Sequence, residues 1–258
     1  MSRVVGGAAL AVSWLTVVPA RVRTEPDGSL PDGAAPWALR WAPVVGLVLG
    51  AAGGGLLLGL VALGVAPFVA GLLVVGAGAL GTRGMHLDGL ADTADGLGTY
   101  GPSERALSVM SDGGAGPFAV VTVVVVLGAR AGALAQLAGA ETPSVLAACA
   151  VAAATGRAGF CWVARRGVPP ARPGGLGATV AGSQPSWIAP LWWVVLAAAS
   201  VPLLGYAPAV GIALAGVLVV GLAAHTRRRL GGMSGDVLGA ACEIATTTVL
   251  VTLSAALG

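Results

Sequence analysis

The chain has 258 residues, of which 56% are hydrophobic and only 10% are charged, and its mean hydropathy is +0.89. So few charged side chains cannot cover the surface of a water-soluble globule of this size, and lipid must cover much of it. The composition therefore excludes soluble, disordered and fibrous proteins and predicts an integral membrane protein. The net charge of +3 comes from Arg without any Lys. Arg clusters beside membrane spans usually set topology, so we do not expect nucleic acid as a partner.

Seven apolar stretches approach the roughly 20 residues that a membrane-spanning helix needs. They are residues 42–63, 67–82, 116–138, 144–163, 187–203, 208–225 and 237–257. Residues 4–19 form an eighth candidate, which is short and polar at Ser13 and Thr16, so it is either a span or a re-entrant or interfacial segment. We expect one integral membrane domain over residues 1–258, with an all-α fold: a polytopic transmembrane helical bundle with seven or eight spans.

Long polar connections alternate with very short ones along the chain. The long connections are residues 21–41, 83–115, 164–186 and 226–236. They contain eleven of the Arg residues: Arg21, Arg23, Arg40, Arg83, Arg105, Arg165, Arg166, Arg172, Arg227, Arg228 and Arg229. By the positive-inside rule the long connections are cytoplasmic, including an acidic loop at about 83–115. We expect a multi-pass protein of the cytoplasmic (inner) membrane.

Small residues dominate the apolar stretches. The 42 Gly residues and the many Ala residues indicate helices that pack closely through small faces. The three cysteines, Cys149, Cys161 and Cys242, have spacings that match no metal-thiolate pattern. We interpret them as small buried hydrophobic residues and expect no disulfide framework. The oligomeric state stays open, and a homo-oligomer is one alternative.

Aspartates are densest in residues 83–96. On a helix, Asp88, Asp92 and Asp95 would lie at i, i+4 and i+7 and share one face. Such a stripe of carboxylates attracts a cation, and oxygen ligands suit a hard ion such as Mg²⁺. The alternative is a solvated loop with helix-capping aspartates, although the apolar residues between the aspartates count against it.

A second acidic pair opens the last apolar stretch. Asp236 and Glu243 are seven residues apart and share a helical face, and Asp236 could instead help to cap that helix. Glu243 lies about two turns inside the stretch, where an ionisable side chain is by default a functional candidate. The alternative is a structural ion pair with Arg130 or Arg157. Together those two guanidinium groups could also hold phosphate oxygens.

Two further side chains near the aspartates have both a functional and a structural interpretation. His86 is either a functional residue (a base, a metal ligand or a hydrogen-bond donor to phosphate) or a structural side chain with satisfied hydrogen bonds. Asp112 is either a turn residue or a fourth acidic ligand.

The segment from His86 to Gly98, followed by Glu104 to Asp112, resembles the signature of the cobalamin synthase family, the adenosylcobinamide-GDP ribazoletransferases. Similar pieces in the same order span nearly the whole chain. They are Leu15–Pro19, Pro43–Leu47, Thr155–Arg157, and Gly235–Ala240 with Glu243.

The resemblance implies a membrane enzyme that uses Mg²⁺ to join adenosylcobinamide-GDP to α-ribazole or its 5′-phosphate, releasing GMP. We expect its active site to face the cytoplasm, because the candidate residues map to the Arg-rich side. The residues expected to be catalytic are His86, Asp88, Asp92 and Asp95. The expected metal ligands are Asp88, Asp92, Asp95, Asp112 and Glu243. The residues expected to bind substrate are Arg83, Arg105, Arg157 and Asp236.

Two alternatives belong to other classes. A CDP-alcohol phosphotransferase also places aspartates on membrane helices, but its motif has Ala-Arg after Asp-Gly, whereas Asp88-Gly89 is followed by Leu90-Ala91-Asp92. A cation or proton transporter would distribute acidic residues across the depth of the membrane. Here all the clustered acidic residues except Glu243 are expected at one face.

Overall fold

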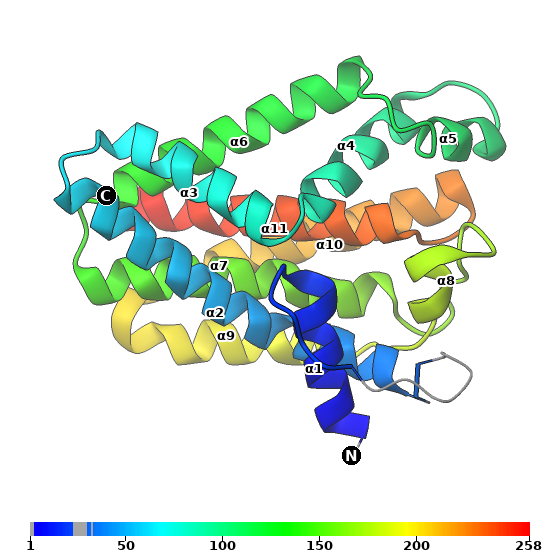
Figure 1. Ribbon diagram of the computed structural model, residues 1–258, viewed down its shortest axis with the longest axis horizontal. Helices are drawn as coiled ribbons and strands as arrows, with labels where there is room; N and C mark the ends of the chain where they lie inside the picture. Colours follow the sequence, from blue (N-terminus) through cyan, green and yellow to red (C-terminus); the bar gives the residue numbers. More distant parts are fainter. Residues whose placement is uncertain (1–2, 23–29, 32) are drawn as a thin grey trace.

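The computed structural model describes residues 3–22, 30–31 and 33–258, so Arg23 lies outside the described residues. The described residues form eleven helices and no strand, which confirms the all-α expectation (Figure 1). The helices are α1 (Arg3–Leu15), α2 (Ala34–Ala62), α3 (Pro67–Gly81), α4 (Met85–Gly98), α5 (Ser103–Val109), α6 (Pro117–Leu137), α7 (Thr142–Val163), α8 (Gly175–Val180), α9 (Ile188–Leu204), α10 (Ala207–Leu230) and α11 (Gly235–Leu257).

Five of these helices are long and apolar enough to cross a membrane: α2, α6, α7, α10 and α11. The pair α3 and α4 would make a sixth span, although the two helices meet at 94°. The predicted count of seven or eight spans is therefore not confirmed. The 13 residues of α1 reach only about 20 Å, less than the roughly 30 Å core of a bilayer. The 17 residues of α9 reach about 26 Å.

The chain turns sharply between α3 and α4. Arg83 has a φ of 57° and Gly84 a φ of 68°, so two successive residues adopt the left-handed conformation. The Gly84 N–H donates to the Ala79 carbonyl at 2.7 Å, as at a helix end closed by a left-handed residue. The segment expected as an acidic loop at about 83–115 thus holds α4 and α5, with the turn at Arg83 and Gly84 before them and loops between and after them.

The core lies around α7 and α11, whose most apolar windows are 78% and 72% buried. Small residues permit the close packing that the composition predicts. A Cβ atom on Gly46 of α2 would lie 2.6 Å from the Ala153 carbonyl oxygen of α7, so only glycine lets these backbones approach. The three cysteines are buried and free, as expected.

The two ends of the bundle differ in their connections. Figure 1 shows α5, α8 and the start of α11 at one end. The short turns after α2, α6 and α9 lie at the other end, with the C-terminus. We call the first the loop end and the second the turn end.

Helix α1 packs on α2 and runs across the long helices (Figure 1), so the structure favours the interfacial or re-entrant interpretation of residues 4–19.

Candidate active site

Two glycines bring α4 against α11. A Cβ atom on Gly89 would lie 2.7 Å from the Asp236 carbonyl oxygen, and one on Gly239 would lie 2.9 Å from the His86 carbonyl oxygen. These distances are shorter than ordinary van der Waals contacts, so the two backbones touch directly. The close approach places the aspartates of α4 next to the first turn of α11.

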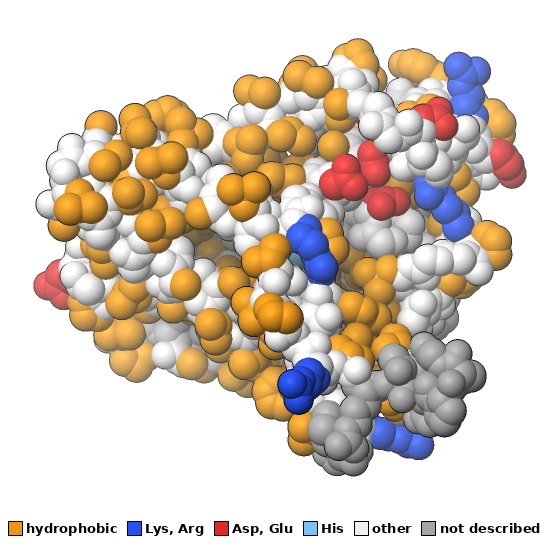
Figure 2. All heavy atoms as spheres, viewed as in Figure 1, with side chains coloured by type: hydrophobic (Ala, Val, Ile, Leu, Met, Phe, Trp, Pro, Cys, Tyr) orange, Lys and Arg blue, Asp and Glu red, His pale blue; other side chains and the backbone are white. Residues whose placement is uncertain are grey.

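Three carboxylates form the cluster that we call the acidic site: Asp88 and Asp92 on α4, and Asp236 on α11. Asp88 is exposed, whereas Asp92 and Asp236 are half-buried. Asp92 is close enough to Asp88, Asp236 and Arg172 to interact with each of them electrostatically. Like charges this close repel one another and favour a bound cation. Figure 2 shows acidic side chains gathered on the surface over α4.

The first turn of α11 orients Asp236. The Ser234 hydroxyl donates to the Asp236 carboxylate at 3.1 Å, and its oxygen accepts from the Val237 N–H at 3.4 Å. Ser234 therefore caps α11, which leaves the Asp236 carboxylate available.

The donor set of the acidic site fits Mg²⁺. All three side chains offer carboxylate oxygens, the ligands that this ion prefers, and they are reachable from the surface. In the described part of the chain, no Arg lies within ion-pair distance of these carboxylates. Their oxygens are therefore not neutralised by a direct ion pair within those residues.

Asp95 differs from the other two aspartates of the predicted stripe. Its carboxylate is buried and accepts hydrogen bonds from the Gly116 N–H at 2.6 Å and the Ala119 N–H at 2.9 Å. Asp95 thus satisfies amides at the start of α6 that have no partner within their own helix. Asp95 therefore caps a helix, which is the alternative to a metal ligand given for these aspartates in the sequence. Exposed Asp112, in the connection from α5 to α6, lines the same surface hollow as Asp95.

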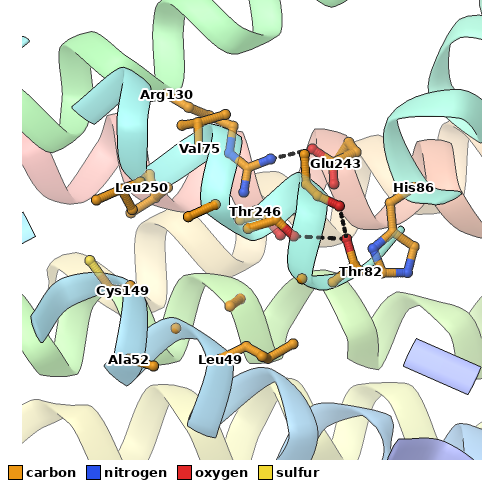
Figure 3. A pocket seen from close by; sticks show the side chains of 18 of the residues that line it. Leu49, Ala52, Val75, Thr82, His86, Arg130, Cys149, Glu243, Thr246 and Leu250 are labelled. Carbon is orange, nitrogen blue, oxygen red and sulfur yellow. Dashed lines mark hydrogen bonds and ion pairs between the residues drawn. The ribbon is translucent and has the colours of Figure 1, made fainter. Parts of the chain in front are cut away.

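A second polar cluster lies deeper, at the base of a cavity of about 250 Å³ between α2 and α3, which we call the arginine cavity. Arg130, His86 and Glu243 line it (Figure 3), and so does Arg157. Glu243 forms an ion pair with Arg130, which is one of the two predicted alternatives for this carboxylate. Glu243 is seven residues further along α11 than Asp236, roughly 10 Å, so it belongs to a different cluster.

His86 lies in the arginine cavity rather than on the acidic stripe. Its ring is buried and packs on Phe160, with ring centroids 5.6 Å apart. Ligand atoms of His86, Cys242 and Glu243 all lie within 4.8 Å of one another. The two guanidinium groups nearby make this group a poor cation site, because they add positive charge.

Two of the residues expected to bind substrate lie elsewhere. Arg83 donates through Nη2 to the Ser13 and Trp14 carbonyls at 2.8 and 3.0 Å, which ties the α3–α4 turn to the end of α1. Arg105 is exposed on α5. Neither of them lines the arginine cavity.

Arg172, expected from the sequence only to set topology, lies at the acidic site. It interacts electrostatically with Asp92 and Asp236, and its Nη2 donates to the Leu107 carbonyl at 2.7 Å. Together with the segment Gly174–Gly177 and Asp236, it lines a hollow of about 220 Å³ between α8 and α11. The signal in the sequence was an Arg directly before Pro173-Gly174-Gly175, a flexible segment that can approach a ligand closely.

Comparison with known proteins finds one matching family and relatives that share one name. The family model described as cobalamin-5-phosphate synthase matches residues 7–254. An adenosylcobinamide-GDP ribazoletransferase of Nocardioides sp. is 37% identical over 95% of this chain and 96% of its own length. Proteins of the same name from Corynebacterium efficiens and Rhizobium etli are 36% and 35% identical, over 95% and 86% of this chain and 90% and 88% of their own lengths. No solved structure matches.

Proposed function

Because the chain belongs to the cobalamin-5-phosphate synthase family, we propose that it joins adenosylcobinamide-GDP to α-ribazole or its 5′-phosphate at the acidic site. A ribazole hydroxyl oxygen forms a bond to the phosphorus that carries adenosylcobinamide. The bond from that phosphorus to the bridging oxygen of the diphosphate breaks, and GMP leaves with the bridging oxygen. Family membership decides against the phosphotransferase and transporter alternatives.

The observation that carries this proposal is the convergence of Asp88, Asp92 and Asp236 from two helices beside Arg172. A displacement at a diphosphate requires that its negative charge be neutralised and that the attacking and leaving oxygens be held in line. The acidic site combines oxygen ligands for a cation with a guanidinium group that can bind phosphate oxygens.

Each residue of the acidic site has a role in this proposal. Asp88, Asp92 and Asp236 would hold Mg²⁺, which when bound neutralises charge on the transferring phosphate. Arg172 would bind phosphate oxygens of the donor in the hollow that it shares with Asp236. Asp88, the most exposed of the three carboxylates, would accept the proton of the attacking hydroxyl.

We also propose that this site faces the cytoplasm. The aspartates of the acidic site lie toward the loop end of the bundle, and so does the helix terminus that carries Arg227, Arg228 and Arg229. An excess of Arg at one end marks the cytoplasmic side of a multi-pass protein.

The direct test is an assay of purified protein in detergent with adenosylcobinamide-GDP and α-ribazole, with release of GMP as the readout. We expect turnover that stops when EDTA removes divalent cations and that returns with excess Mg²⁺. GMP release that is unchanged in EDTA would contradict the role of the acidic site. No GMP release under any condition would contradict the reaction itself.

A further inference from the structure

The arginine cavity contains a charge that the proposed reaction does not use. Arg157 is buried, with 6% of its surface exposed, and points into the cavity from α7. Its Nη1 donates to the Ala153 carbonyl of its own helix at 3.1 Å, and its buried Nε has no hydrogen-bond partner. Among the described residues, no carboxylate lies within ion-pair distance of Arg157.

The cavity as a whole is positively charged. Arg130 and Arg157 line it with only one carboxylate, Glu243, which is paired with Arg130. With His86 counted as neutral, one positive charge stays uncompensated. A buried charge without a partner is strongly unfavourable in an apolar environment, so this site favours an anion. The same charge argues against a cation bound by His86, Cys242 and Glu243.

The opening of the cavity is apolar. Exposed residues at its rim are Ala52 and Leu56 on α2, and Ala77 and Gly78 on α3. Figure 2 shows the surface hollowed between the regions formed by these two helices. Helix α2 is one of the five candidate spans, so this opening lies at the level of the lipid. A ligand that enters here must have an apolar body behind its anionic group.

We propose that the arginine cavity binds a phosphate group whose apolar body lies between α2 and α3. The Arg157 guanidinium binds two phosphate oxygens side by side, with Arg130 as the second cation. This site goes beyond the acidic site, from which it is separated by about two turns of α11. Two ligands share the required chemistry: a phosphorylated nucleoside with an apolar base, such as α-ribazole 5′-phosphate, and a phospholipid of the surrounding bilayer.

The test measures equilibrium binding to purified protein in detergent, with neither adenosylcobinamide-GDP nor Mg²⁺ present. Two pairs of probes differ only by a phosphate: α-ribazole 5′-phosphate against α-ribazole, and dioleoyl phosphatidic acid against dioleoylglycerol. We expect at least one phosphorylated probe to bind about tenfold or more tightly than its partner. Arg157→Gln should abolish this preference, whereas the control Arg166→Gln, an exposed residue after α7, should retain it.

The outcomes separate the two sources. A preference for α-ribazole 5′-phosphate that depends on Arg157 assigns the cavity to the nucleoside, and one for phosphatidic acid assigns it to the lipid. Equal affinities within both pairs, or the same preference in Arg157→Gln, would overturn the proposal. If Arg157→Gln does not fold, Arg157→Lys keeps the charge, loses the paired contacts and should reduce the preference several-fold. Because the donor substrate is absent, these results are independent of GMP release.

Discussion

Asp92 has several charged neighbours in and around the acidic site. It interacts with Asp88, Asp236 and Arg172, and also with Asp95. Asp92→Asn keeps the shape of the side chain and removes one negative charge, so a bound cation loses a ligand while repulsion within the cluster falls. We expect GMP release to drop by about two orders of magnitude or more without a lower melting temperature. Exposed Glu104 on α5 provides a matched control, since Glu104→Gln should keep full activity. Full activity in Asp92→Asn would remove this residue from the metal site.

The two partners of the ion pair between Arg130 and Glu243 should differ in how much stability their removal costs. Glu243→Gln leaves Arg130 and Arg157 together without a carboxylate, whereas Arg130→Gln leaves one positive and one negative charge. Breaking a buried pair by removing one partner typically costs about 3–5 kcal/mol. We expect Glu243→Gln to fall in that range and Arg130→Gln to cost clearly less. Thermal and denaturant unfolding in detergent would measure both. A larger loss in Arg130→Gln would show that Arg157 does not interact with Glu243.

At the scale of single residues, the sequence predicts which side chains share a helical face, but not which groups lie opposite them. The spacing of Asp88 and Asp92 predicts that both share one face of a helix, and α4 carries both of them. Only the structure shows that Asp236 lies beside them. The same spacing includes Asp95, whose carboxylate is bound by amides of α6. Those amides are 21 and 24 residues further along the chain, and their position depends on the loop before α6. Only the tertiary structure distinguishes a metal ligand from a cap.

At the scale of helices, the sequence predicts most positions and misses one change of direction. The apolar stretch at 67–82 agrees with α3, which covers Pro67–Gly81. Hydropathy carries no information about the direction of an axis, so the 94° bend that follows is not visible in it. The bend begins at Arg83, a non-glycine residue with a left-handed φ, which sequence rules would not choose for that conformation. It is this bend that aims α4 along α11.

The contact between α4 and α11 should tolerate no side chain at Gly89. Gly89→Ala would place a Cβ atom 2.7 Å from the Asp236 backbone oxygen, so one helix must move away. Overpacking of this kind costs about 1–3 kcal/mol, and here it also separates Asp92 from Asp236. We expect a lower melting temperature and at least a tenfold loss of GMP release. In the control Gly221→Ala on α10, a Cβ atom meets nothing within 4 Å, and we expect unchanged activity and equal or greater stability. Equal behaviour of the two variants would contradict close packing at Gly89.

At the scale of the whole molecule, the two ends of the bundle have different chemistry. The loop end carries the acidic site, Arg172 and the Gly174–Gly177 segment. Within the described residues, the turn end carries the short connections and the C-terminus. The arginine cavity lies between them and opens toward lipid through α2 and α3. A water-soluble donor can thus approach the acidic site from one aqueous side, while a ligand with an apolar body can reach the cavity from the bilayer.

This asymmetry predicts which residues a membrane-impermeant thiol reagent can reach. The native cysteines are buried, so a single added cysteine should give the signal. Ser111, exposed after α5, lies at the loop end, and Thr142, exposed at the start of α7, lies at the turn end. If the Arg-rich end is cytoplasmic, Ser111→Cys should be labelled only in inside-out vesicles and Thr142→Cys only in intact spheroplasts. The opposite pattern would place the acidic site outside the cytoplasm. Labelling of both positions from one side would contradict the orientation of α6, because this helix separates the two residues along the chain.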